Sequence, residues 1–219
     1  MISRRLLLTS AAALGTVPFS GSLLAAPVSP VLGKEYIQVR PALEFPKSPI
    51  VIHDFFAYTC PHCLTFAPVM EKYVASLKDN PNVKVVPVPV AWNEDLSIFP
   101  RVYYSFEALG LLEKHHMDFW NWVIRAEHNW KTPADIEKDV LKWAGENGID
   151  AEKFRQTLGS FSVVSKYRQA TRMWKNYGVD STPCVGVAGR WITAPHLTGT
   201  RQGTIDVIEW LVKKVAEEK

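Results

Sequence analysis

Residues 50–63, IVIHDFFAYTCPHC, join a run of apolar residues to a Cys-x-x-Cys motif. The run from Ile50 to Tyr58 is nearly continuous, which predicts a strand that is covered on both faces. After the motif, apolar residues recur at the spacing of one helix face: Phe66, Met70, Tyr73, Val74 and Leu77. The sequence therefore places Cys60 where a strand ends and a helix begins.

The predicted position of Cys60 favours an acidic thiol. A helix N-terminus has unpaired backbone N–H groups and a partial positive charge, and both stabilise a thiolate. Pro61 suits the first helical position, and Cys63 lies three residues on, on the same face as Cys60. The imidazole of His62 is a second group that can stabilise the thiolate. A stabilised thiolate makes the disulfide of the pair a stronger oxidant.

These residues resemble those of a known family, the thioredoxin-fold thiol:disulfide oxidoreductases, and most closely its DsbA-type periplasmic members. The resemblance rests on the strand that ends in Cys60-Pro61-His62-Cys63, on Thr182-Pro183 downstream, and on the order of elements across roughly 34–216. It implies an α/β fold of the thioredoxin type with a helical insertion domain. It also implies a redox-active disulfide between Cys60 and Cys63, with no separate cofactor.

The resemblance further implies a reaction and its partners. The substrates would be reduced, unfolded polypeptides that have been exported, and the products would carry new disulfides. A DsbB-type membrane protein linked to quinone would reoxidise the dithiol, and the protein would act as a monomer. A disulfide isomerase or reductase of the same fold would use the same residues, so that alternative remains open, although no segment is long enough for the separate dimerisation domain that such isomerases usually carry.

Asp54 is the one carboxylate of the central strand, six residues before Cys60. By resemblance it matches the acidic residue that the family keeps beneath its active site, where Glu is more usual. Its implied role is to take or relay a proton from Cys63. Burial would raise the pKa of Asp54 towards neutral pH, as that role requires. A solvent-facing Asp at an irregularity of the strand is the competing interpretation.

Thr182 and Pro183 match the cis-proline loop that faces the Cys-x-x-Cys motif in thioredoxin folds. The backbone of Thr182 would then pair with an extended substrate segment as an added strand. Cys184 departs from the family pattern. We expect it to be a buried, small apolar residue whose side chain points away from Cys60, with a third redox thiol as the alternative.

The length of the chain and its net charge limit its domain organisation and its partners. The chain has 219 residues, of which 47% are hydrophobic, enough for one thioredoxin-like domain with an insertion. The net charge of +3, to which Arg4 and Arg5 contribute, is too balanced to indicate nucleic-acid binding. We therefore expect partners that are proteins.

The N-terminus has the features of an export signal in residues 1–26. Arg4 and Arg5 precede an apolar run and a group of small residues, and either the secretory or the twin-arginine route fits. Gly15 and Pro18 interrupt the run, which argues against a membrane anchor. Export would place the protein in the periplasm, where a Cys-x-x-Cys motif can cycle as a disulfide.

The remaining pattern predicts the arrangement of elements. We expect residues 27–219 to form one domain from about 34–94 and 161–216, with a helical insertion at about 95–160. In the strand over 83–90, Pro87 and Pro89 indicate an edge strand or an irregularly paired one. The other predicted features are a first strand at 34–39, helix starts at Thr132-Pro133 and Asp150, helix ends at Gly145, Gly148, Gly159 and Gly178, a hairpin over 185–193 and a C-terminal helix to about Val215.

The insertion is rich in Trp and His. Helical spacing predicts that the Trp residues belong mainly to the core: Trp120, Trp122, Trp130 and Trp143. We interpret His115, His116 and His128 as exposed residues and predict no metal site, because adjacent histidines point to different helix faces and no carboxylate–histidine pairing of recognisable spacing accompanies them. A metal-binding module that uses the Cys60–Cys63 pair is a remote alternative for the same reason.

Overall fold

The fold is built on one mixed sheet. The computed structural model describes residues 29–218, and in that part of the chain the strand order is β1-β5-β4-β2-β3. The strands are β1 (Tyr36–Gln38), β2 (Ile50–Phe56), β3 (Val83–Pro89), β4 (Cys184–Val187) and β5 (Trp191–Thr193). Strand β2 pairs with β3 in parallel and with β4 in antiparallel. As predicted, the proline-containing β3 lies at an edge of the sheet.

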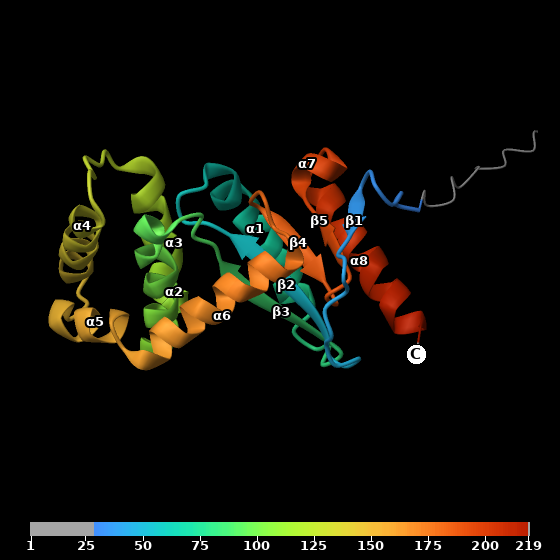
Figure 1. Ribbon diagram of the computed structural model, residues 1–219, viewed down its shortest axis with the longest axis horizontal. Helices are drawn as coiled ribbons and strands as arrows, with labels where there is room; N and C mark the ends of the chain where they lie inside the picture. Colours follow the sequence, from blue (N-terminus) through green and yellow to red (C-terminus); the bar gives the residue numbers. More distant parts are fainter. Residues whose placement is uncertain (1–28, 219) are drawn as a thin grey trace, which may run out of the picture.

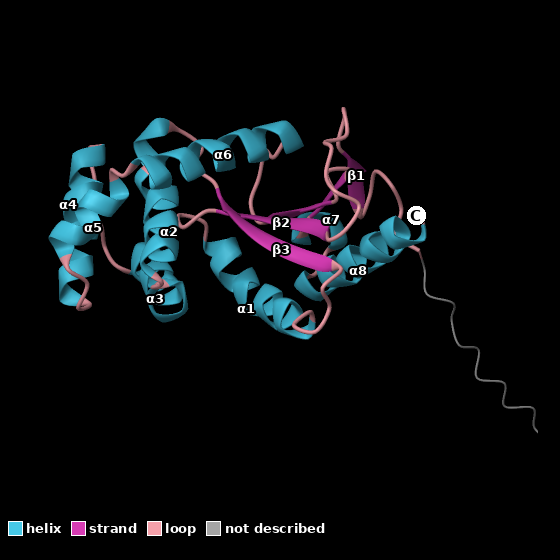
Figure 2. Ribbon diagram, turned by 90° about the horizontal axis from the view of Figure 1, so that it is seen from below, coloured by secondary structure: helices cyan, strands magenta, loops and turns pink. Residues whose placement is uncertain are grey.

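Helices cover both faces of the sheet, as Figures 1 and 2 show. Helix α6 (Phe161–Tyr177) lies on one face, and α1 (Pro61–Ser76) and α8 (Arg201–Glu217) lie on the other. The short α7 (Pro195–Thr198) precedes α8. Because the inner strand β2 is buried from both sides, its sequence is almost continuously apolar.

The predicted helical insertion is confirmed between β3 and α6. After a short 3-10 helix η1 (Glu94–Leu96) come α2 (Ile98–Leu109), α3 (Leu112–Arg125), α4 (Pro133–Glu146) and α5 (Ala151–Leu158). They gather at one end of the sheet (Figure 1). Their shared core is rich in aromatic residues, of which Phe106, Phe119 and Phe154 are fully buried. None of the helices within residues 29–218 is long and apolar enough to cross a bilayer.

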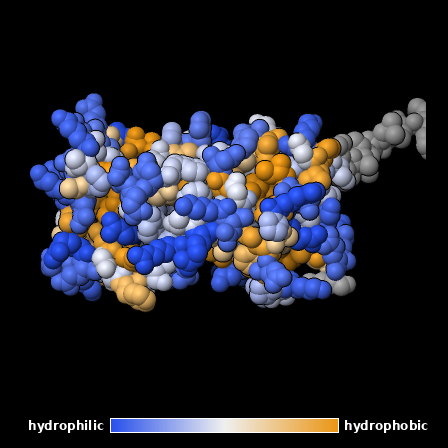
Figure 3. Space-filling model, viewed as in Figure 1, coloured by the Kyte–Doolittle hydropathy of each residue, from blue (hydrophilic) through white to orange (hydrophobic). Residues whose placement is uncertain are grey.

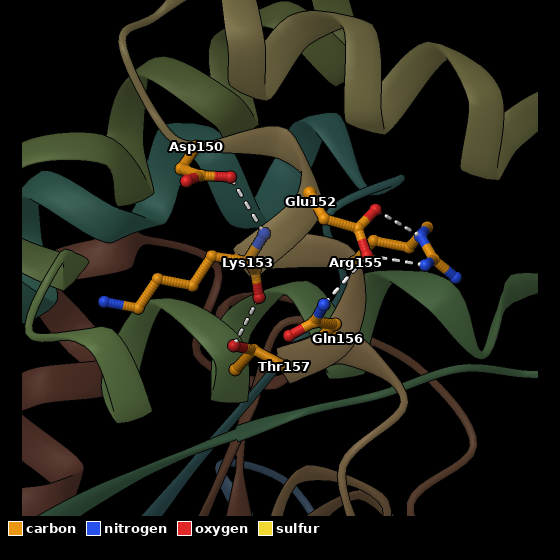
Figure 4. Close-up of polar contacts among 6 residues, drawn as sticks. All are labelled: Asp150, Glu152, Lys153, Arg155, Gln156 and Thr157. Carbon is orange, nitrogen blue, oxygen red and sulfur yellow. Dashed lines mark hydrogen bonds and ion pairs between the residues drawn. The ribbon is translucent and has the colours of Figure 1, made fainter.

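Side-chain caps define where the insertion helices begin. Thr132 accepts a hydrogen bond from the backbone of Asp135 and the Asp135 carboxylate accepts one in return, so α4 starts with a capping box. Asp150 accepts from the backbone N–H of Lys153 at 2.9 Å at the start of α5 (Figure 4). The sequence placed a helix end at Gly145, but α4 continues one residue further, to Glu146.

The end of β2 and the start of α1 belong to the core of the insertion. Phe56, Tyr58 and Cys63 are nearly inaccessible and lie in the same cluster as the aromatic residues of α2 and α3. The Cys-x-x-Cys turn therefore lies between the sheet and the insertion and touches the cores of both.

Hydrophilic residues cover most of the face shown in Figure 3, and hydrophobic ones are scattered among them.

Candidate active site

The Cys-x-x-Cys turn begins helix α1 with Cys60 as its N-cap. The backbone N–H of Cys60 bonds the carbonyl of Ala57 at 3.0 Å, which holds the turn after β2. The Sγ atom of Cys60 accepts from the backbone N–H of Cys63 at 3.3 Å and lies 3.3 Å from the carbonyl oxygen of Thr182. Pro61 takes the first helical position, as predicted. Both cysteines are free thiols in this structure.

The two thiols differ in their surroundings and therefore in acidity. The Cys63 thiol, by its hydrogen bond to Cys60, and the backbone N–H groups of Cys63 and His62 lower the pKa of Cys60 to about 6. Cys63 is 2% exposed, and burial raises its pKa well above the ordinary value, an effect that the neighbouring Cys60 increases. At neutral pH the pair therefore carries its negative charge on Cys60.

His62 supports the site through its backbone. His62 is exposed, and within residues 29–218 its imidazole makes no hydrogen bond to the Cys60 sulfur. The hydrogen bond expected from this side chain is therefore absent within those residues, whereas the backbone N–H of His62 does help to lower the pKa of Cys60. Stabilisation of the thiolate by a positively charged imidazole stays a prediction.

Thr182 and Pro183 lie against the motif, as the resemblance implied. The peptide bond between them is cis, and the Thr182 carbonyl is the neighbour of the Cys60 sulfur. Thr182, Pro183 and His62 also line a cavity of about 540 Å³ on the α7–α8 side of the motif. The loop is therefore placed to meet any chain that approaches Cys60 from this side.

Asp54 lines a second and larger cavity, of about 700 Å³, together with Cys63 and Pro183. Its strand is regular, since Asp54 pairs with Pro87 on one side and Val185 on the other. Although the side chain is partly accessible from the cavity, the protein around it removes enough water to raise the pKa of Asp54 to about 7. The structure thus brings the carboxyl and the buried thiol to the same cavity.

A tyrosine–histidine contact that was not predicted from the sequence lies beside the motif. The Tyr58 hydroxyl lies 2.7 Å from Nδ1 of His116, and the His116 ring packs against Phe56, Tyr103 and Trp120. Burial lowers the pKa of His116 to about 4, so the imidazole is neutral at pH 7. The four-residue spacing of Leu112, His116 and Trp120, which puts them on one helix face, was a signal for this inward position.

The expectation that the insertion histidines are exposed is wrong. His115 is 4% exposed and faces Phe106 and Trp143, while His116 points the other way, towards the motif. His128 is half-buried and stacks on Trp130 with ring centroids 3.8 Å apart. Helix α3 is covered on two sides, and adjacent residues on it therefore both reach protein. No group of three or more potential metal ligands occurs within residues 29–218.

Cys184 is buried at 3% exposure and starts β4 opposite Phe55 of β2. Burial raises its pKa, so the thiol is protonated at neutral pH. This confirms the prediction of a small buried residue. Among the predicted core tryptophans, Trp120 and Trp143 are buried, whereas Trp122 and Trp130 are half-buried at the edge of the same core.

Comparisons with known proteins agree with this geometry. The DSBA-like thioredoxin domain matches residues 51–202. The thiol:disulfide interchange protein DsbA of Burkholderia cepacia is 31% identical over 218 residues, which are 99% of each chain. DsbA of Bordetella pertussis is 30% identical over 208 residues, 94% of each chain.

The fold is also that of a solved structure. DsbA of Pseudomonas aeruginosa superposes with a TM-score of 0.74, covers 86% of this chain and 97% of its own, and shares 22% of residues. That likeness concerns the fold, while the family-model match and the relatives at 30% and 31% identity extend across the motif and the cis-proline loop. The chain therefore belongs to the DsbA-like family of thioredoxin-fold thiol:disulfide oxidoreductases.

Proposed function

We propose that this oxidoreductase works as an oxidant, which introduces disulfides into exported polypeptides through a Cys60–Cys63 disulfide. The observation that carries the proposal is the low pKa of Cys60, about 6, beside a Cys63 whose pKa is raised. A thiolate held by its surroundings stabilises the dithiol form of the protein. The disulfide form is correspondingly easier to reduce, which favours transfer of the disulfide to a substrate.

The proposed reaction has two thiol exchanges. A substrate thiolate attacks Sγ of Cys60, the Cys60–Cys63 bond breaks, and Cys63 leaves as a thiolate that takes up a proton. A second substrate thiolate then attacks the substrate sulfur of the mixed disulfide and releases Cys60 as a thiolate. The substrate loses two electrons and the protein disulfide gains them.

Asp54 is the proposed proton donor to Cys63 in the first exchange and the proton acceptor on reoxidation. Support comes from the cavity that both residues line and from the Asp54 pKa of about 7, which makes transfer in either direction feasible near neutral pH. In the variant Asp54→Asn, single-turnover reduction of the disulfide should slow and lose its pH dependence near 7. A pH–rate profile identical to that of the native protein would remove the relay.

Thr182 and Pro183 are the proposed substrate-binding residues, with Pro61 and His62 shaping the motif. An extended substrate segment that pairs with the backbone of Thr182 would bring its cysteine over Cys60, because the Thr182 carbonyl is already 3.3 Å from that sulfur. Such pairing uses main-chain groups, so it would accept many sequences. The substrates we propose are reduced, unfolded polypeptides.

The location and partners are also proposals. The predicted signal at 1–26 lies outside the described residues, and we propose periplasmic export on the strength of its sequence and of the family. There, a DsbB-type membrane oxidase linked to quinone would regenerate the disulfide. We propose that the protein acts as a monomer, in one domain with its insertion at about 95–160, and without a nucleic-acid partner.

The decisive experiment is the reduction potential of the Cys60–Cys63 couple, measured by equilibration with glutathione. A potential well above that of the glutathione couple identifies an oxidant, and one well below it identifies a reductase. Oxidation of a reduced, unfolded protein by the purified disulfide form should give the same answer, with Cys60→Ser as the inactive control. Metal analysis of the same samples would test the remote alternative, a metal-binding module.

A further inference from the structure

The cavity of about 540 Å³ at the Cys-x-x-Cys motif is lined by a distinctive set of polar side chains. We call it the Arg201 cavity and define it by His62, Thr65, Thr182, His196 and Arg201 among its lining residues. No acidic residue lines it, whereas a guanidinium and two imidazoles do. The other cavity of the active site contrasts with it, because that one is lined by Asp54 and two glutamates. The cavity on one side of the motif is therefore lined by acidic side chains, and the cavity on the other side by basic ones.

Arg201 is held at the cavity by the helix that carries the motif. Its Nη2 atom donates to Oγ1 of Thr65 at 3.0 Å, and the Thr65 hydroxyl donates to the carbonyl of His62 at 2.9 Å. Two hydrogen bonds in sequence, through Thr65, thus connect the guanidinium to His62 of the motif. It has no ion pair among the salt bridges of residues 29–218, and the first turn of α8 contains no acidic residue.

A guanidinium with unused donors in a cavity suits a carboxylate. Arginine offers five N–H groups in a planar fork, and only one hydrogen bond to the protein is recorded for Arg201 within the described residues. A carboxylate can accept two parallel N–H···O bonds from such a fork. The free face of Arg201 therefore fits the side chain of Asp or Glu better than that of Gln, and it repels Lys.

We propose that the Arg201 cavity selects substrates that carry Asp or Glu close to the reacting cysteine. This inference rests on the proposed function, since it assigns a preference to the same exchange reaction. The Thr182 loop forms a wall of the cavity and also touches the Cys60 sulfur. Because an extended chain advances about 3.3 Å per residue, the cavity would receive a side chain within about three positions of the cysteine.

The test uses dithiol peptides that differ at one position. Glu, Gln, Lys or Leu is placed in turn at each of the three positions on either side of the first cysteine. Reduction of the Cys60–Cys63 disulfide is followed by acid quenching, alkylation and mass spectrometry. Each rate is divided by the rate of the same peptide with an uncharged small-molecule disulfide, because a neighbouring carboxylate also changes the reactivity of the peptide thiol.

For the native protein we expect Glu to exceed Gln about two- to fivefold at one or two positions, the range of an ion pair with an exposed arginine. Arg201→Gln should remove the preference, and Arg201→Glu should reverse it in favour of Lys. The matched control is Arg168→Gln, which removes the same charge from exposed α6 and should keep the preference for Glu. High salt should weaken the native preference as well.

The outcomes separate this inference from the proposed function. Equal normalised rates for Glu and Gln at every position would overturn the inference, and so would a preference for Leu, which would make the cavity an apolar subsite. Both outcomes leave the oxidant intact, because the Gln peptides still react. If no peptide reduces the disulfide while dithiothreitol does, the proposed function fails with it.

Discussion

Tyr58, two residues before the motif, and His116, on helix α3 of the insertion, are joined by a hydrogen bond of 2.7 Å between the hydroxyl and Nδ1. Both rings are packed among aromatic residues that water hardly reaches. Because the buried Tyr58 hydroxyl would be costly to leave without a hydrogen-bond partner, this bond ties the end of β2 to the insertion. The position of the motif therefore depends on a helix that lies more than fifty residues away in sequence.

The first prediction concerns this bond. His116→Phe should lower the free energy of unfolding by about 1–3 kcal/mol, since it leaves the buried Tyr58 hydroxyl unsatisfied, and Tyr58→Phe should lower it by about 0.5–1.5 kcal/mol, since His116 is only part-buried and can bond water instead. The double variant should cost less than the sum of the two, with an interaction energy of about 1 kcal/mol. Urea denaturation at pH 7, where His116 is neutral, measures all four proteins. Strict additivity would show that the bond contributes nothing.

The second prediction concerns the acidity of Cys60. In the reduced protein, the ultraviolet absorbance of its thiolate should appear with a midpoint near pH 6. The hydrogen bond from the Cys63 thiol is the largest cause of that low pKa, so Cys63→Ala should raise it, while Cys63→Ser keeps a donor and should raise it less.

A Cys60→Ala variant serves as the control for this titration. It should show no thiolate in the same range, because burial raises the pKa values of both Cys63 and Cys184. An unchanged midpoint in Cys63→Ala would instead assign the low pKa of Cys60 to the helix terminus alone.

The third prediction concerns stability and pH through Asp54. Its pKa in the fold, about 7, lies above the ordinary value of 3.8, because burial disfavours the ionised carboxylate. The stabilisation from the protonated form is complete below about pH 4 and is lost as the pH rises through 7. Asp54→Asn should therefore raise the free energy of unfolding at pH 8, on the order of 2 kcal/mol, and change it little at pH 4.

The measurement is denaturant unfolding of the reduced protein at both pH values. Exposed Asp206→Asn on α8 is the control and should show no comparable pH-dependent gain. Equal stabilisation of the Asp54 variant at pH 4 and pH 8 would contradict the raised pKa.

The fourth prediction concerns Gly186 of β4. A Cβ atom at this position would lie 2.3 Å from the Tyr177 ring, whose hydroxyl also bonds His53 and the backbone of Gly189. Gly186→Ala should lower the free energy of unfolding by about 1–3 kcal/mol or more. Gly145→Ala is the matched control, since nothing lies within 4 Å of that Cβ and the position is helical.

The control should stabilise the protein by about 0.5–1 kcal/mol, because alanine is the better helix former. The measurement is thermal unfolding, in which the midpoint temperature of each variant is compared with that of the native protein. No loss of stability in Gly186→Ala would mean that the Tyr177 ring moves aside without cost.

Local patterns were sufficient to predict most elements of this protein. The apolar run over 50–58, the proline at the first position of α1, the caps at Thr132 and Asp150 and the hairpin of β4 and β5 each depend on residues close in sequence. Such features follow from periodicity, backbone geometry and short-range hydrogen bonds. The motif itself, with Cys60 at a helix N-terminus, is of this kind.

The tertiary structure alone decided which side chains face the motif. It placed the carbonyl of Thr182 beside Cys60, turned His116 inward and left the imidazole of His62 exposed. It also set the pKa values of Asp54 and Cys63, because these depend on how much water the surrounding helices exclude. Sequence spacing reports the face of a helix, but burial and long-range contacts arise only when separate elements pack together.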